Sequence, residues 1–439
     1  MKPSETKKFL SNAIQALKEG NWLFTRNPGK DFSRKRKLTF ENLLCFVLAL
    51  RGGSVANEML DYFGMSASIP SASAFTQQRA KILPEAFSAL FSLFTQSISE
   101  NKCYKGYRLL AVDGSDVLLQ SNPSDKDSFF QGIQERKSYN LLHINALYDL
   151  EQHIYLDAIV QKRRKSDENG ALTCMVDRSD IAKALLTADR GYESYNNMAH
   201  IQQKGWKFLI RIKDGLHGIR SGLELPVQDE FDVPISLKLT KKQTNVTKEL
   251  VKDRNHYKWL PTKSRFDFLP QKSKKDGPAQ LFELNFRIVR FRLSENSFET
   301  VVTNLDAAEF PPCELKKLYA RRWGIETSFR ELKYTVGLLH FHAKRVEFVL
   351  QEIFARLIMY NFAESITQSV IVRKKSRKYI YKANFSSAVH ICRQFFLGNI
   401  SPPKVEALIA RYISPFRPGR TRPRKLTAKY AVSFIYRVA

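Results

Sequence analysis

The sequence predicts an α/β protein with a mixed-sheet core, a β-rich insertion, and helical N- and C-terminal regions. Strand-length apolar runs alternate with helical patterns in 101–212, which is typical of the first part of a mixed-sheet core. A Lys-, Thr- and Pro-rich stretch with short strand patterns occupies 213–300. Helical periodicity dominates 1–100, 301–365 and 366–439, and we expect 301–365 to complete the core.

The N-terminal region is predicted to be helical. Apolar residues recur at helical spacing in Phe9, Ile14 and Leu17, and again within 43–50. A Gly-Gly pair follows, and residues 71–82 read SASAFTQQRAKI. Helices around a glycine-containing break fit a small DNA-binding unit, or equally a plain helical bundle that covers the core.

The core strands are predicted from buried apolar runs. YRLLAVDG predicts a short strand that ends in Asp113, and ALLTADRGY predicts one that ends in Asp189. Residues 141–150 and 154–161 are two period-two runs separated by a turn, which predicts a hairpin. KFLIRI at 207–212 predicts a further strand.

The insertion contains one irregular strand pattern. Residues 282–293 alternate between polar and apolar until Ile288 and Val289, where the alternation slips by one residue. A β-bulge is the simplest explanation, because one extra residue moves every later side chain to the other face. Residues 299–305 predict a strand that returns to the core.

Residues 314–365 are predicted to be helical. At ~100° per residue, four polar side chains fall within about 60° of one another: Tyr319, Arg322, Glu326 and Lys333. The neighbouring sector is apolar and is predicted to pack on the sheet: Leu318, Ile325, Phe329, Leu332 and Val336. A solvated i,i+4 charge ladder would explain Arg322 and Glu326, but it leaves Tyr319 and Lys333 unexplained.

Charge indicates the partner. The chain has 71 Lys and Arg against 43 Asp and Glu, a net charge of +28, and the excess recurs along the whole sequence. Such a surface attracts polyanions by long-range steering and counterion release, so we expect a nucleic acid partner. The alternative is a basic protein whose charge serves only solubility.

Other sequence features restrict the class of protein. The five cysteines include no C-x-x-C pair, so neither a disulfide framework nor a structural zinc site is predicted. The start MKPSETKKFL has no apolar signal core, and the longest apolar run is far shorter than the ~20 residues that span a bilayer. We expect no membrane contact and a cytoplasmic location, with nucleoid association when DNA is bound.

Three carboxylates are the candidate catalytic and metal-binding residues. Asp113 and Asp189 each end a predicted strand beside a glycine, although either one alone could cap a helix or open a turn. Asp116 competes with Asp113 but lies inside the next apolar stretch. With Glu326 they form a trio of hard oxygen ligands that suits two Mg²⁺ or Mn²⁺ ions, the arrangement used in phosphodiester chemistry. The pair His340 and His342 is not predicted to bind metal, because positions i and i+2 diverge on a helix.

These motifs resemble a known family. VDGS at Asp113, ADRGY at Asp189 and the spacing Y-x-x-R-x-x-x-E-x-x-x-x-x-x-K that contains Glu326 are similar to the DDE transposases of prokaryotic insertion sequences. Within these enzymes, the chain resembles the Y-R-E-K signature group, the insertion sequence family four type. The resemblance extends over about residues 40–430, and RPGRTRPRK at 417–425 resembles the family's basic tail.

The resemblance implies an RNase H-like core and cut-and-paste DNA transposition. It implies a homodimer in a synaptic complex on the terminal inverted repeats of its own element, nicking by metal-activated water, a hairpin route, and strand transfer to target DNA. Asp113 would bridge two metal ions, and Asp189 and Glu326 would hold one each.

The resemblance also implies a set of DNA contacts. Phosphates near the cut would be held by Tyr319, Arg322 and Lys333, and the expected contacts also include Arg190 and Arg330. A flipped base would stack on Trp259, the tryptophan of the insertion, or on Trp323. Two other functions stay open: another RNase H-like nuclease, and an inactive or domesticated transposase-derived DNA-binding protein.

Overall fold

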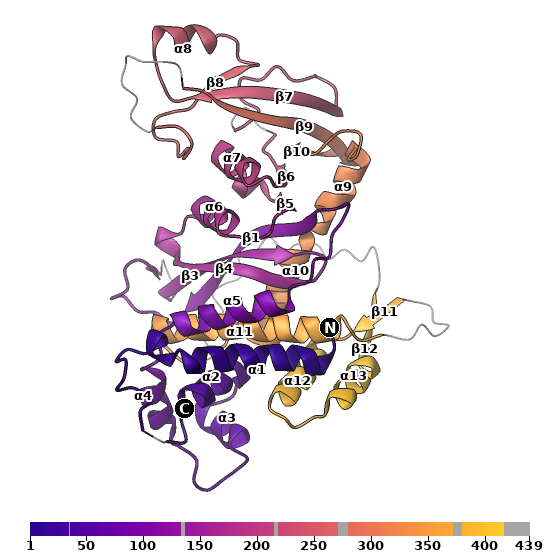
Figure 1. The fold of residues 1–439 in the computed structure, drawn as a ribbon. Helices are drawn as coiled ribbons and strands as arrows, with labels where there is room; N and C mark the ends of the chain where they lie inside the picture. Colours follow the sequence, from indigo (N-terminus) through magenta and orange to yellow (C-terminus); the bar gives the residue numbers. More distant parts are fainter. Residues whose placement is uncertain (35, 133–136, 215–217, 271–279, 372–379, 417–439) are drawn as a thin grey trace.

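The computed structural model describes the chain except for residues 35, 133–136, 215–217, 271–279, 372–379 and 417–439. The predicted basic arm, 417–425, lies outside the described residues. In Figure 1 most N-terminal and C-terminal helices lie together at the bottom of the view, and the strands of the insertion lie at the top, at the other end of a long sheet.

The first hundred residues form a group of helices: α1 (Pro3–Glu19), η1 (Asn21–Phe24), α2 (Phe40–Ala49), α3 (Val55–Tyr62), α4 (Ala72–Arg79) and α5 (Glu85–Ile98). Polar caps begin three of them, because Thr39, Ser54 and Ser71 each accept a hydrogen bond from a backbone amide of the first turn. The group packs on the long helix α11 (Val346–Thr367), which contacts α1, α2 and α5 (Figure 1).

Five strands form the predicted core: β1 (Arg108–Leu119), β3 (Tyr139–Asp149), β4 (Ile154–Lys162), β5 (Ala184–Ala188) and β6 (Lys207–Arg211), with the short β2 (Phe129–Phe130) beside β3. Their order is β4-β3-β1-β5-β6. The strand β3 is antiparallel to β1 and β4, whereas β5 is parallel to β1 and β6. This is the strand order of an RNase H-like core, so the predicted fold class is confirmed, as is the predicted hairpin of β3 and β4.

The insertion strands extend the same sheet. They are β7 (Phe231–Thr240), β8 (Tyr257–Trp259), β9 (Phe282–Ser294) and β10 (Ser297–Thr303), with α8 (Asn245–Leu250) between β7 and β8. Antiparallel pairing of β10 with β6 joins them to the core, and the order continues β10-β9-β7-β8. One continuous hydrogen-bonded ladder therefore runs from the core into the insertion.

The bulge predicted at Ile288 and Val289 is wrong. Pairing of β9 with β7 keeps one register from Phe282 to Arg290. The apolar pattern changes because the strand passes from burial on one face to burial on both. Ile288 packs in the core on one side of the sheet, and Val289 packs in the core on the other.

The prediction that a short strand ends in Asp113 is also wrong. The strand β1 continues to Leu119, and only its fully buried part stops before Asp113. By contrast, β5 ends at Ala188, so Asp189 follows its strand directly, as predicted.

The two faces of the sheet bury separate cores. The helices α6 (Glu168–Asp177) and α7 (Tyr195–Gln203) cover one face (Figure 1). The other face is covered by α5, α10 (Trp323–Glu331) and α11, and it shares its core with the N-terminal helices. Successive residues of β1 alternate between these cores, with Leu109 and Ala111 in the second and Leu110 and Val112 in the first.

The predicted helical stretch 314–365 is interrupted. It consists of α9 (Pro312–Arg321), α10, a π-helical turn η4 (Leu332–Val336) and α11. The single helix used to align Tyr319, Glu326 and Lys333 is therefore wrong, since these residues lie in three successive elements. The apolar sector packs as predicted, with every member at most 4% exposed: Leu318, Ile325, Phe329, Leu332 and Val336.

The C-terminal part adds α12 (Phe385–Phe396), α13 (Pro402–Arg411) and a two-stranded ribbon of β11 (Ile380–Ala383) and β12 (Ile413–Phe416). The short helices η2 (Arg163–Lys165) and η3 (Arg190–Tyr192) complete the fold. The helix α12 packs on α11 and on η4, so it supports the segment that follows α10.

One buried acid of α11 predicts a pH dependence of stability. Burial, with the Glu331 charge as a second cause, raises the pKa of Glu364 from 4.5 to about 8. The folded protein keeps this proton, so its stabilising effect is complete below pH 4.5 and is lost as pH rises toward 8. We expect Glu364→Gln to raise the melting temperature, and the gain to grow between pH 5 and 8.

Thermal unfolding at several pH values measures this gain. Glu347→Gln is the matched control on α11, because the Glu347 side chain is half exposed. A pH-independent difference between Glu364→Gln and wild type would contradict the expectation.

Candidate active site

The three predicted carboxylates come from adjacent elements. Asp113 lies in β1, and Asp189 directly follows β5, which is paired in parallel with β1. Glu326 lies in the first turn of α10, which packs on β1. Asp113 shares the strand face of Leu109 and Ala111, which is the face covered by α10. Neighbouring strands and one helix thus direct the three acids toward the carboxyl end of β5.

The pKa of Asp113 reflects the nearness of the other two acids. Its pKa is raised to about 6, first by burial and further by the negative charges of Asp189 and Glu326. The Gly114 amide, which donates to Oδ1 at 2.9 Å, and the Arg322 guanidinium act in the opposite direction. Burial is thus the main reason that the pKa of Asp113 is raised, and the two neighbouring acids add to it.

Arg322 is the cation at the centre of the site. Its side chain is 5% exposed, and Nη2 donates to Glu326 Oε1 at 2.8 Å. The guanidinium carbon lies 5.5 Å from the Tyr319 ring centroid and 5.4 Å from that of Trp323. Two aromatic rings and one carboxylate thus fix the orientation of Arg322.

Two buried polar atoms of this group have no hydrogen-bond partner among the described residues: Tyr319 Oη and Arg322 Nε. Burial without a partner costs about 1–3 kcal/mol per group, so such atoms indicate a missing ligand or a functional constraint. Both are oriented donors beside the carboxylates, which is the chemistry expected of a phosphate-binding site.

Lys333 approaches the same site from the π-helical turn. Burial lowers its pKa, whereas the charges of Asp116 and Asp113 raise it. Lys333 is therefore a half-buried cation near the strand that carries Asp113. Although the helix is interrupted, Arg322, Glu326 and Lys333 all lie near Asp113, in the middle of β1.

Sequence reasoning missed two residues of this site. Arg211, at the end of β6, forms a 3.0 Å ion pair with Glu299 of β10. Burial raises the Glu299 pKa, and the positive charges of Arg211 and Arg322 lower it, which places Glu299 near the signature arginine. The only sequence signal for Arg211 is its place in the buried strand pattern 207–212, the next predicted strand after the one that precedes Asp189.

A second polar cluster lies on the opposite face of β1. His143 Nδ1 lies 2.6 Å from Asp116 Oδ1, and Nε2 lies 3.2 Å from Glu168 Oε1. Arg163 pairs with both acids, at 3.1 and 3.4 Å. Asp116 is thus engaged by His143 and Arg163 rather than directed to the face of Asp113.

This cluster explains the glycine that follows Asp113. A Cβ at Gly114 would lie 2.4 Å from His143 Nε2, so any side chain would collide with the imidazole. At the second aspartate, the Gly191 amide donates to Asp189 Oδ1 at 2.8 Å. The two glycines therefore serve different purposes: one admits His143, and the other orients a carboxylate.

The remaining predicted DNA contacts are dispersed. Trp323 is 54% exposed beside Arg322, and Arg330 is exposed on α10. Arg190 is exposed directly after Asp189. Trp259 lies in β8, six strand positions from β1 and hence about 29 Å across the sheet, so one chain does not bring it to the carboxylates.

The fit to a divalent metal can be judged from these residues. The trio supplies only carboxylate oxygens, and the charges of Asp189 and Glu326 both act on Asp113, so the donor set fits Mg²⁺ or Mn²⁺ in chemistry. In the described part of the chain, no three His, Cys, Asp or Glu side chains are grouped closely enough to hold a metal ion. Glu326 is instead paired with Arg322.

Comparison with known proteins bears on this site. A family model described as the transposase DDE domain matches residues 104–362, more than half of the chain. The transposase InsG for insertion sequence element IS4, from Escherichia coli strain K12, is 23% identical over 341 residues, 75% of this chain and 70% of that protein. A cryo-EM structure of the piggyBac transposase synaptic complex with hairpin DNA has a TM-score of 0.46 and 11% identity, covering 96% of this chain and 87% of that chain.

The matched range begins before β1, ends within α11 and contains all three carboxylates. The protein is therefore an enzyme of the class that cuts DNA and transfers its strands. It belongs to the transposase DDE domain family and is a DDE transposase of the IS4 type, which confirms the resemblance of its signature motif. This family generally uses divalent metal ions.

None of the helices in the described ranges has the length and apolar character needed to cross a membrane.

The contact between Gly114 and His143 yields a prediction. We expect Gly114→Ala to destabilise the protein by about 1–3 kcal/mol, because the added methyl group displaces a buried ring held by two acids. His143→Ala should recover part of that loss in the double variant, since it makes room for the methyl group. Chemical denaturation of the two single variants and the double variant measures both effects, and equal stability of Gly114→Ala and wild type would disprove the close contact.

Proposed function

We propose that this DDE transposase nicks DNA at the terminal inverted repeats of its own element and transfers the freed strands to target DNA, using Asp113, Asp189 and Glu326. The observation that carries the proposal is the shared electrostatic environment of the three acids. Asp113 is partly buried beside two other carboxylates, and burial together with their charges raises its pKa although Arg322 lies near.

Two Mg²⁺ or Mn²⁺ ions held by this trio would supply an activated water and neutralise the leaving oxygen. The protein's own side chains would hold these ions in place. Asp113 of β1 would hold the metal together with Asp189, which follows β5, and Glu326 of α10. Because Arg322 now occupies Glu326 Oε1, Glu326 would exchange part of that ion pair for metal coordination.

The other three side chains of the Y-R-E-K signature would bind phosphate. Arg322 presents Nε, which lacks a partner among the described atoms, and Tyr319 presents a buried hydroxyl in the same condition. Lys333 is a half-buried cation on the other side of Asp113. Arg190 and Arg330 are exposed and would bind the DNA backbone on either side of the cut.

Trp323 is the better candidate of the two tryptophans to stack an unpaired base within one subunit, because it is exposed beside Arg322. Trp259 would serve a more remote part of the DNA or a strand held by the second subunit of a homodimer. A hairpin route and synapsis as a homodimer are parts of the same proposal.

The N-terminal helices would bind the terminal repeat. The exposed side chains of α4 include Ser73, Thr76 and Gln77, uncharged groups of the kind that read base edges. Arg34 and Arg36 line a cavity together with residues of α4 and its C-terminal extension. Uncharged polar side chains flanked by arginines are typical of a helix that lies in a DNA groove. They are less expected on the surface of a plain helical bundle.

The catalytic proposal is tested by cleavage of a terminal-repeat duplex with Mg²⁺ or Mn²⁺. We expect Asp113→Ala, Asp189→Ala and Glu326→Ala each to lower the rate at least about 10³-fold, since each removes a ligand of the reacting centre. Asp157→Ala is the control, because Asp157 lies on β4, which does not border β1, and is paired with Arg178. Cleavage that survives loss of any one of the three acids would contradict the scheme.

The same assay separates the other functions. Cleavage without transfer of the new end to target DNA would indicate another RNase H-like nuclease. DNA binding with no metal-dependent nicking would indicate an inactive transposase-derived DNA-binding protein.

DNA recognition is tested by binding. We expect the double change Thr76→Ala and Gln77→Ala to weaken terminal-repeat binding about tenfold and to leave unrelated duplexes unaffected. Arg34→Ala should weaken both kinds of DNA and reduce the slope of log affinity against log salt by about one. Equal losses for both duplexes in the α4 variant would show that this helix does not read sequence.

A further inference from the structure

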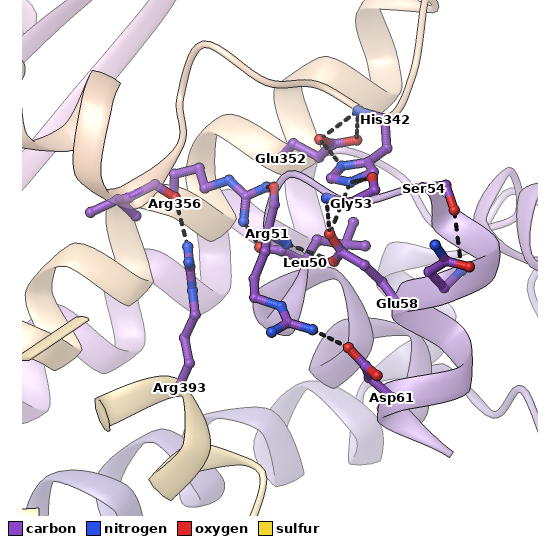
Figure 2. Close-up of polar contacts among 12 residues, drawn as sticks. Leu50, Arg51, Gly53, Ser54, Glu58, Asp61, His342, Glu352, Arg356 and Arg393 are labelled. Carbon is purple, nitrogen blue, oxygen red and sulfur yellow. Dashed lines mark hydrogen bonds and ion pairs between the residues drawn. The ribbon is translucent and has the colours of Figure 1, made fainter. Parts of the chain in front are cut away.

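A short strap between α2 and α3, residues 50–53, is held by buried charged side chains on both sides (Figure 2). The Arg356 guanidinium of α11 donates to the carbonyls of Leu50 and Arg51. The Glu58 carboxylate of α3 accepts from the amides of Arg51 and Gly53, both at 2.6 Å. The strap has no room for a larger residue at Gly53, since a Cβ there would lie 3.0 Å from Glu58 Oε1.

His342 connects this strap to α11. It lies in an irregular segment after the π-helical turn, so the prediction that His340 and His342 sit on a helix is wrong. The His342 side chain is 3% exposed. Its Nδ1 lies 3.2 Å from Glu352 Oε2, and its Nε2 lies 3.2 Å from the Gly53 carbonyl and 3.5 Å from Glu58 Oε1 (Figure 2).

The segment that ends at His342 is the continuation of η4, which carries Lys333. Its other end is also anchored, because Arg393 of α12 donates to the Val336 carbonyl at 2.6 Å. Gly337 then reverses the chain with φ of 99°, and the Leu338 amide closes back on Leu332. Lys333 therefore sits in a turn that is fixed by Arg393 at its end and by His342 a few residues further on.

The charges around His342 come from three elements. Glu58 belongs to α3, Glu352 and Arg356 belong to α11, and Arg79 of α4 pairs with Glu352 at 2.9 Å. The Arg79, His342 and Arg356 charges outweigh burial and hold the pKa of Glu352 at about 2. The carboxylates raise the pKa of His342 although burial opposes this, so His342 joins two acids and two arginines in one buried cluster of charges.

We propose that His342 is a positioning residue for Lys333: by joining Glu352, Glu58 and the Gly53 carbonyl, it locks the segment after η4 against the N-terminal helices and so fixes where the lysine meets the phosphate. This inference rests on the proposed role of Lys333. It also gives the N-terminal helices a direct mechanical connection to the active site, independent of the sheet.

The small net stability of a buried ion pair favours a role for His342 in positioning the segment over a role in stabilising the fold. A buried ion pair contributes little net stability compared with apolar packing, but it permits few geometries, and removal of one member is costly. An apolar contact would let the segment slide, whereas the His342 ring is fixed through both nitrogens. An error of about 1 Å in a phosphate-binding cation can cost up to about 100-fold in rate.

The test is a double-mutant cycle on single-turnover cleavage of a terminal-repeat duplex. We expect His342→Gln to slow cleavage about tenfold in wild type and less than about twofold when added to Lys333→Ala, because it would act through a lysine no longer present. Equal fold losses in both backgrounds would overturn the proposal.

Asn361→Ala is the matched control for loss of stability. Asn361 is a buried residue of α11 that bonds the Tyr155 backbone and Thr95, away from the 332–342 segment. The Asn361→Ala change should lower the melting temperature. It should slow cleavage by the same factor in wild type and in the Lys333→Ala background. If the losses in cleavage rate were also non-additive for Asn361→Ala and Lys333→Ala, the role of His342 would be purely structural.

A second measurement does not depend on cleavage. Amide hydrogen exchange across 332–342 should accelerate at least about tenfold in His342→Gln and stay unchanged in Asn361→Ala, since only the former releases the segment. Unchanged exchange in His342→Gln would overturn the inference even if the enzyme proves inactive. A wild type that fails to cut DNA but shows this exchange pattern would refute the proposed function and leave the positioning intact.

The pH dependence supplies a third readout. Because the pKa of His342 is raised above 6.5, its contribution is complete below pH 6.5 and is lost as pH rises through the raised value. The pKa values of Glu58 and Glu352 are lowered, so both stay ionised over this range. The stability difference between wild type and His342→Gln should therefore shrink from pH 6 to pH 9, and a constant difference would contradict the ion-pair role.

Discussion

Parallel pairing of β1 with β5 is the constraint on which the site depends. It brings the end of β5 beside the middle of β1, so that Asp113 and Asp189 lie on one face of neighbouring strands. Apolar residues buried on both faces of β1 fix its register, because a slip of one residue would exchange its two cores. Packing of α10 on β1 then adds Glu326. The accumulation of negative charge at Asp113 follows from this hydrophobic arrangement.

Much of the fold could be predicted because its strands are short, apolar and separated by clear turns. The hairpin of β3 and β4, the strand before Asp189 and the apolar sector around Ile325 and Phe329 all follow from local periodicity. The acids of the candidate site were recognisable because each stands beside such a pattern. These features are set by residues that are close together in the chain. Periodicity in the sequence detects such short-range patterns.

The failures arise where a distant partner decides the local structure. Val289 breaks the alternation of β9 because a second core, formed by other elements, covers that face. The break between α9 and α10 and the π-helical turn have no signal in helical spacing. Arg211 looks like an ordinary strand-end cation until β10 brings Glu299 beside it. His342 becomes interpretable only when α3 and α11 supply its carboxylates.

The shared ladder between β6 and β10 has a consequence for the architecture of the enzyme. Because β10 pairs with β6 and the order continues through β9 and β7, the insertion continues the core sheet and is not joined to it by loops alone. DNA bound along its strands would be held at a fixed angle to the carboxylates, as by a rigid arm. On the proposed function, the length of this arm would set how far from the carboxylates such DNA can lie.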